Sequence, residues 1–162
     1  SGLSPILSRA VEGGRLWTRD WPRVPSSLSP DCAVVHVHRA DVNGNCQIDG
    51  AAGFAPELAR AAQRVIITAE EIVGEEVIRA APERTVIPFY LVDAVVHAPF
   101  AAHPGEMCGV YRRDEAALRD YLRAGADAAG TRAYLERFVT GVPDHAAYRR
   151  RVGRERLEAL RV

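Results

Sequence analysis

The sequence predicts a three-layer α/β fold in which a mainly parallel sheet lies between helices, followed by a helical C-terminal third. Two apolar runs, Ala33–His38 and Arg64–Ala69, have the length and β-branched content of strands. A helical pattern that begins at Pro56 separates them. A strand, a helix and a strand in this order form a βαβ unit, which implies a parallel pair of strands. The third observation is the series of amphipathic helical patterns after residue 113.

The composition restricts the class of protein. A chain of 162 residues with 48% apolar and 26% charged residues is long enough for one domain with a core. Its 21 basic and 21 acidic residues balance, which argues against non-specific binding to nucleic acid or to an acidic membrane. We find neither an apolar stretch of transmembrane length nor a signal-peptide pattern, and therefore expect a cytoplasmic protein.

The three cysteines, Cys32, Cys46 and Cys108, show no metal-binding or redox spacing. Reduced thiols in a cytoplasmic protein are the simplest interpretation, and a nucleophilic cysteine is the alternative.

Two regions are expected along the chain. Residues 1–29 form a short helix capped by Ser4 and then an exposed arm, and residues 30–162 form the α/β domain. Trp17 and Trp21 lie in the arm, where they either pack back onto the domain or mark an interface with a partner.

After the second strand, the patterns indicate a weak helix at Glu75–Ala81 and strands at Thr85–Ile87 and Phe89–His97. Asp93 interrupts the last of these strands. A buried carboxylate needs partners, so Asp93 is expected to accept backbone hydrogen bonds or to mark a bend, with a place near a site as the alternative. A loop follows at Phe100–Cys108.

Three helices are expected in the C-terminal third. Asp114 is a suitable N-cap for the first, and Gly130 and Thr131 open the second, which ends at Gly141. Pro143 begins the last helix, whose many arginines are expected to form a solvated face.

Polar residues follow both predicted parallel strands, at the sheet edge where ligands bind in open α/β folds. The Asp41–Asn45 segment is either a structural turn or a turn that lines a binding cleft. Glu70 and Glu71 follow the second strand, and a carboxylate there can act as a general base or a nucleophile. Neighbouring strand residues point to opposite faces, so only one enters a cleft, and the other is expected to pair with an arginine such as Arg39. Structural roles for both remain the alternative.

The histidines give two further candidates. His36 and His38 share one face of a strand and, with Glu70, could hold a metal ion. No third ligand has a fixed spacing, so we predict no metal site. His103 lies on a loop with glycine and proline and is the stronger candidate for a functional role. Motifs of hydrolase elbows, kinases and dinucleotide-binding proteins are not found in the sequence.

Three blocks, HVHRADVNGNCQIDG, ELARAAQRVIITAEEIV and PERTVIPFYLVDAVVHAPFAAHP, occur in order between about Pro30 and Gly153. Together they resemble the second half of the A-type chain of family I CoA-transferases, in particular the glutaconate CoA-transferases. The resemblance implies a CoA-transferase-like fold that is incomplete here. It also implies acyl-CoA thioesters of small (di)carboxylic acids as substrates, with coenzyme A carried as the substrate's thioester and no tightly bound cofactor.

In that family the nucleophilic glutamate normally lies on the B-type chain, so the resemblance implies a B-type partner and no activity of this chain alone. The glycine-rich loops of the N-terminal half have no counterpart here. We therefore expect the chain to associate with itself, with a missing N-terminal half or with a B-type subunit. A CoA-thioester hydrolase, a decarboxylase of the same fold and a non-catalytic interaction domain remain alternatives.

The resemblance also suggests site residues. Glu70 and His103 are the catalytic candidates on this chain, and the arginines of the last helix form a patch for CoA phosphates as an alternative to a solvated face. The positions expected to bind substrate are Arg39, Asn43, Asn45 and Gln47.

Overall fold

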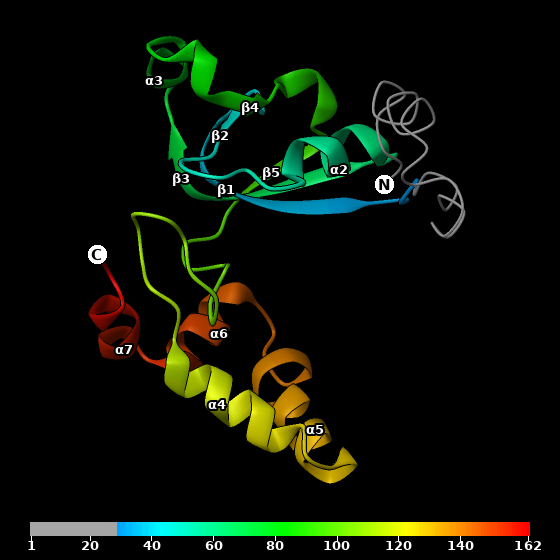
Figure 1. Cartoon of the computed structure of the whole chain (residues 1–162), viewed down its shortest axis with the longest axis vertical. Helices are drawn as coiled ribbons and strands as arrows, with labels where there is room; N and C mark the ends of the chain where they lie inside the picture. The colour runs from blue at the N-terminus through cyan, green and yellow to red at the C-terminus, as the bar shows by residue number, and fades with distance from the viewer. Residues whose placement is uncertain (1–28) are drawn as a thin grey trace, which may run out of the picture.

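The computed structural model describes residues 29–162, so the predicted N-terminal helix and the arm with Trp17 and Trp21 lie outside the described residues. Figure 1 shows a sheet with short helices on one side and the C-terminal helices on the other. This arrangement confirms the α/β fold with a helical C-terminal part. Between residues 29 and 162, no helix is long and apolar enough to cross a membrane.

The sheet has five strands in the order β4-β2-β1-β3-β5. Their bounds are β1 Ala33–Asp41, β2 Cys46–Gln47, β3 Val65–Val73, β4 Thr85–Ile87 and β5 Ala94–His97. As predicted, β1 and β3 are parallel, with Val35 opposite Ile67, and β3 is also parallel to β5. The pairs β1–β2 and β2–β4 are antiparallel, so the sheet is mixed rather than mainly parallel. The reason is the tight turn after β1, which can only return the chain antiparallel.

Two short helices accompany the sheet, and four helices with a π-helical segment form the C-terminal part. Their bounds are α2 Ala55–Ala61, α3 Glu75–Arg79, α4 Glu115–Ala124, α5 Ala128–Leu135, the π-helical segment Glu136–Thr140, α6 His145–Val152 and α7 Arg154–Ala159. Pro56 stands in the first turn of α2, as predicted, where its missing N–H costs no hydrogen bond. Two 3₁₀ turns, Pro82–Arg84 and Phe89–Leu91, flank β4.

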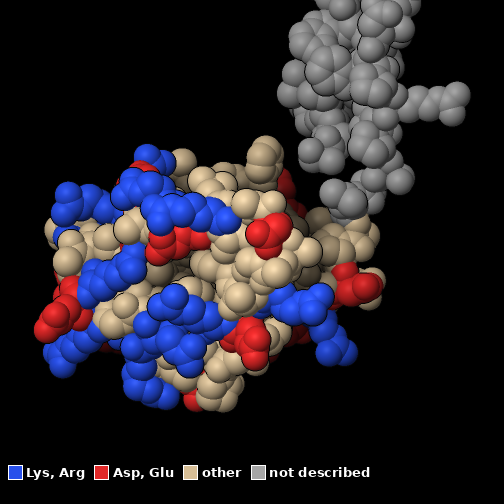
Figure 2. Space-filling view, turned by 90° about the horizontal axis from the view of Figure 1, so that it is seen from below, with Lys and Arg blue, Asp and Glu red and all other residues tan. Residues whose placement is uncertain are grey.

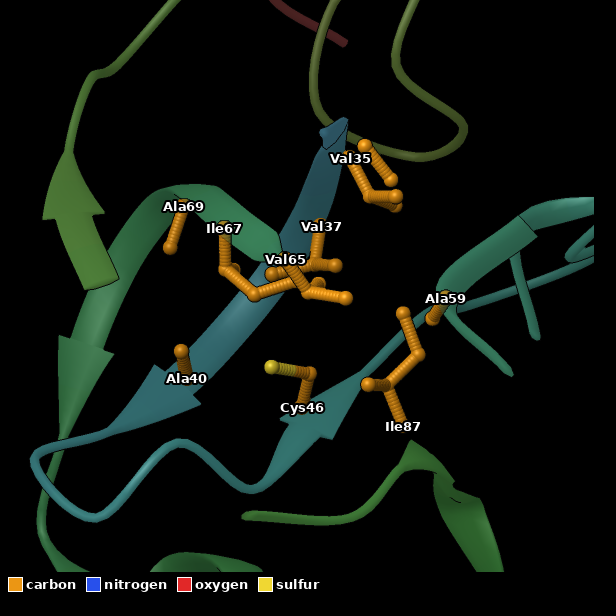
Figure 3. Packing of buried hydrophobic residues seen from close by; sticks show 10 residues of the cluster. Val35, Val37, Ala40, Cys46, Ala59, Val65, Ile67, Ala69 and Ile87 are labelled. Atoms are coloured by element: carbon orange, nitrogen blue, oxygen red, sulfur yellow. The ribbon is translucent and has the colours of Figure 1, made fainter. Parts of the chain in front are cut away.

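The main core lies between the sheet and α2. Figure 3 shows Val37 and Ile67 from the two central strands close to Cys46 of β2, Ile87 of β4 and Ala59 of α2. A second, smaller cluster joins the loop after β5 to α7. Its buried members are Phe100, Met107, Tyr111 and Leu157.

The predicted strand Phe89–His97 is wrong in its first half. Phe89–Leu91 forms a 3₁₀ turn, because the Asn45 side chain takes the Phe89 N–H that a strand would use. Asp93 precedes β5 and accepts a hydrogen bond of 2.7 Å from the backbone N–H of Val65, as predicted. It also lines a cavity next to Asn43, which agrees with the alternative of a place near a site.

Two predicted helix boundaries also differ. The second C-terminal helix begins at Ala128 rather than at Gly130, because the Asp127 side chain caps it by accepting the Gly130 N–H at 2.7 Å. The last predicted helix is split into α6 and α7 at Gly153, whose φ of 101° a helix cannot contain. Asp114 caps α4 as predicted, by accepting the Ala117 N–H at 2.9 Å.

Candidate functional site

Glu70 on β3 is the centre of a buried hydrogen-bond network. Its Oε1 atom lies 2.8 Å from Nε2 of His36 and 2.8 Å from the Tyr111 hydroxyl. The backbone N–H of Phe100 donates to both carboxylate oxygens, at 2.9 and 3.0 Å. Burial favours the protonated acid, but the hydrogen bonds from His36, Phe100 and Tyr111 outweigh it and hold the pKa of Glu70 below its ordinary value.

These contacts favour a structural role for Glu70. The residue is only 6% exposed, and its oxygens are occupied by donors from β1 and from the loop after β5. The neighbouring Glu71 is exposed, as the alternation of a strand requires. It does not pair with Arg39 as expected, because the Arg39 guanidinium binds both carboxylate oxygens of Asp49 at 2.7 and 2.8 Å.

The turn after β1 is built around the buried carboxylate of Asp41. Its Oδ1 atom accepts hydrogen bonds from the backbone N–H groups of Asn43, Gly44 and Asn45, all at 2.8–2.9 Å. Its Oδ2 atom accepts one from Nδ2 of Asn45 at 2.8 Å. Gly44 has a φ of 103°, as predicted for a tight Asn-Gly turn. Asn45 therefore holds the turn through Nδ2 and connects it to Phe89 through Oδ1, which accepts the Phe89 N–H at 3.1 Å.

Asn43 is the predicted substrate-binding residue that reaches a cavity. Its side chain is exposed and helps to line a space of about 290 Å³ together with Val42, Ile72 and His97. The cavity extends from the ends of β1 and β3, the edge at which the sequence predicts a binding cleft, along residues 92–95 and β5. Gln47, by contrast, is buried and donates a hydrogen bond of 3.0 Å to the Ala81 carbonyl.

His36 and His38 do not form a metal site with Glu70. Nε2 of His38 lies 2.8 Å from the Cys108 carbonyl, and its Nδ1 accepts the Asp49 N–H at 3.0 Å. Within residues 29–162, no group of three or more His, Cys, Asp or Glu side chains has a geometry that could hold a metal ion.

His103 belongs to a second polar cluster, which is distant along the chain from the Asn43 turn. Its Nδ1 atom is 2.6 Å from the Tyr148 hydroxyl, and its Nε2 atom is 3.1 Å from Oδ2 of Asp114. Nη2 of Arg156 donates to the other oxygen of Asp114 at 2.8 Å.

The charges in this cluster are matched. The Arg156 guanidinium holds the pKa of Asp114 well below its usual range, and burial raises the pKa of Tyr148 to about 12. Sequence reasoning identified His103 but missed Tyr148 and Arg156. Both follow more than forty positions later on other helices, and no spacing rule connects them to a loop histidine.

The comparisons with known proteins agree with the fold. Residues 24–98 match the family model described as "Coenzyme A transferase". Over 82% of the chain, the sequence is 35% identical to the A-type chain of glutaconate CoA-transferase from Acidaminococcus fermentans. It is 31% identical, over 78% of the chain, to the A-type chain of 3-oxoadipate CoA-transferase from Pseudomonas knackmussii. The chain spans 41% and 44% of the lengths of these two relatives.

A solved structure extends the likeness to three dimensions. The crystal structure of glutaconate CoA-transferase from Acidaminococcus fermentans superposes with a TM-score of 0.80 at 34% identity. The match covers 83% of this chain and 42% of that one. Sequence and structure therefore agree that the chain is a member of the coenzyme A transferase family and corresponds to part of an A-type subunit.

Proposed function

We propose that the chain is part of the A-type subunit of a cytoplasmic CoA-transferase that moves coenzyme A between small carboxylic acids, at least one of which is a dicarboxylic acid. The observation that carries this proposal is the TM-score of 0.80 with glutaconate CoA-transferase at 34% identity. The names of the two curated relatives, glutaconate and 3-oxoadipate CoA-transferase, both refer to dicarboxylates. An acyl-CoA thioester is then a substrate, and no tightly bound cofactor is required.

We expect the catalytic glutamate on a B-type partner chain. A carboxylate that attacks a thioester needs an accessible oxygen with a free lone pair. Glu70 does not offer one, because Tyr111, His36 and a backbone N–H occupy its buried oxygens. The contribution of this chain is then to shape the cleft at the carboxyl edge of the sheet, next to Asn43.

The experiment is a reconstitution. The chain is co-expressed with the B-type subunit and with the N-terminal half of the A-type subunit from its source, and the purified complex is incubated with acetyl-CoA and either glutaconate or 3-oxoadipate. Mass spectrometry should detect the dicarboxylyl-CoA and free acetate in equal amounts. Each chain alone should form neither product.

The intermediate identifies the nucleophile. Borohydride reduces a glutamyl-CoA thioester, so treatment during turnover should modify a glutamate of the partner chain and leave the Glu70 peptide unchanged. Free CoA without a new thioester would indicate a hydrolase, and release of carbon dioxide would indicate a decarboxylase. If the complex forms but consumes no CoA thioester at all, an interaction domain is the better description.

A further inference from the structure

A second cavity, remote in sequence from the Asn43 edge, lies among the C-terminal helices. It encloses about 310 Å³ between α4, α5, the π-helical segment and α6. This volume falls at the lower end of the range for small-molecule sites. Small residues such as Ala117 and Ala133 line it together with aromatic, basic and acidic side chains.

The cavity lining carries more positive than negative charge, with three arginines and one aspartate, Asp120. Arg137 and Arg151 both line it, and neither forms an ion pair with a carboxylate in residues 29–162. Arg151 donates a hydrogen bond of 3.0 Å to the Arg137 carbonyl, which brings the two residues together. Arg156 also lines the cavity, but its charge is matched by Asp114. Asp120 lies 3.5 Å from Arg123, so the two guanidinium groups of Arg137 and Arg151 leave the lining with a net positive charge that suits an anion.

The face of the molecule that carries the C-terminal helices is rich in basic side chains, with acidic ones among them. Figure 2 views the molecule from below the C-terminal helices and shows many basic side chains on that face. The sequence contains no lysine, so all of these side chains are arginines. Arginine binds planar anions such as carboxylates with two parallel hydrogen bonds, which a lysine cannot do.

The aromatic side chains form an apolar wall beside the arginines. The rings of Tyr134 and Phe138 are 4.9 Å apart, and those of Phe138 and Tyr148 are 6.4 Å apart. The Arg137 guanidinium lies 4.8 Å from the centre of the Phe138 ring. A flat hydrocarbon group can pack against such a wall while its charged end reaches the guanidinium groups.

The geometry points to a binding site for a small carboxylate with a flat apolar body. The carboxylate would be held by Arg137 and Arg151, and the body would pack on Phe138 and Tyr134. Tyr148, whose hydroxyl is hydrogen-bonded to His103, lines the same cavity. This site does not depend on CoA transfer, and it can be tested without any activity.

The test is isothermal titration calorimetry of the purified protein with benzoate, compared with acetate, benzyl alcohol and inorganic phosphate. Benzoate should bind at least tenfold more tightly than each of the others, because only benzoate combines the charge with the ring. Equal binding of acetate or phosphate would show that the aromatic wall is not used, and equal binding of benzyl alcohol would show that the arginines are not used. Either result, or no benzoate binding, overturns the proposal.

Three variants locate the site. Arg151→Met removes one charge at nearly constant length, and Ala133→Leu fills the cavity without changing its charge. Each should weaken benzoate binding at least tenfold. Arg132→Met is the matched control, since Arg132 is exposed on α5 outside the cavity lining. Circular dichroism should show that all three variants are folded. Benzoate binding that is unchanged in both Arg151→Met and Ala133→Leu would place the ligand elsewhere and refute the assignment.

Discussion

The hydroxyl of Tyr111 donates a hydrogen bond of 2.8 Å to Oε1 of Glu70. Tyr111 is 1% exposed, and the same hydroxyl accepts the backbone N–H of Ala102 at 3.1 Å. Through this oxygen, strand β3 is connected to the loop that leads to the C-terminal helices. The contact thus supports both the sheet and the second hydrophobic cluster.

Replacing Tyr111 by Phe should therefore destabilise the protein. The ring still packs, but the Ala102 N–H and one oxygen of Glu70 lose a buried partner, which costs about 1–3 kcal/mol. Urea unfolding measures the loss. Tyr90→Phe is the control, because Tyr90 is 73% exposed, and its free energy of unfolding should change by less than about 0.5 kcal/mol. Equal effects of the two substitutions would contradict the proposed role of the hydroxyl.

Asp114→Asn should lower stability because it leaves the Arg156 guanidinium without its charged partner. Asparagine is as good an N-cap as aspartate, so the cap on α4 is kept and the loss of about 1.5–3 kcal/mol reflects the charged hydrogen bonds. Asp127→Asn is a matched control, since Asp127 caps α5 and is exposed. Thermal unfolding of both variants at pH 7 should show a clear decrease in midpoint for Asp114→Asn only.

The contribution of Asp114 should also depend on pH. Its pKa in the folded protein is held below the ordinary value of 3.8 by Arg156, so the unfolded chain binds its proton first as the pH falls. The stabilisation is therefore fully present well above pH 3.8 and is lost progressively below it. Urea unfolding from pH 7 to pH 3 should show the difference between wild type and Asp114→Asn shrinking at the acid end. If the difference in the free energy of unfolding instead increased towards acid pH, the pKa of Asp114 would be raised, not lowered, in the folded protein.

Gly44→Ala should destabilise the turn after β1. The φ of Gly44 is 103°, and a Cβ atom would lie 3.0 Å from Cβ of Val92. Strain and crowding together should cost about 1–3 kcal/mol in unfolding experiments. Gly125→Ala tests the same change where φ is −70° and the nearest atom is 3.5 Å away. There alanine should be neutral or stabilise by about 0.4–1 kcal/mol, because it restricts the unfolded chain.

The three cysteines should differ in reactivity. Burial and the nearby charge of Asp41 raise the pKa of Cys46 to about 12, whereas Cys32 and Cys108 are exposed. Only the thiolate reacts with iodoacetamide. Peptide mass spectrometry after labelling at pH 8 should find Cys32 and Cys108 modified and Cys46 protected. In guanidinium chloride all three should react, and fast labelling of native Cys46 would show that β2 is not packed as described.

The sequence predicts those parts of the molecule that depend on local pattern. The parallel pair of β1 and β3 follows from two apolar runs around a helix, and Asp114 is recognisable as a cap. The side-chain partners are not local. Glu70 finds Tyr111 forty-one positions away, and His103 finds Tyr148 forty-five positions away. Neither separation belongs to a motif that can be recognised in a sequence.

The wrong prediction of a strand at Phe89–Leu91 also arises from a contact between residues far apart in the sequence. The apolar residues of Phe89–Leu91 look like a strand, but Phe89 is 55% exposed and its N–H belongs to the Asn45 side chain. Arg39, Asn45 and Gln47 each have a hydrogen-bond partner within the fold that the sequence pattern does not reveal, and their expected role in substrate binding stays a prediction.

The strand order also suggests how the protein assembles. The Asp41 turn joins β1 to β2 over a few residues, so this hairpin requires little loop-closure entropy. The pairing of β1 with β3 closes a loop of about thirty residues and is expected to follow more slowly. In this order of events β1 pairs first with β2 and then with β3. A substitution of Asp41 would then delay folding itself, in addition to weakening the finished structure.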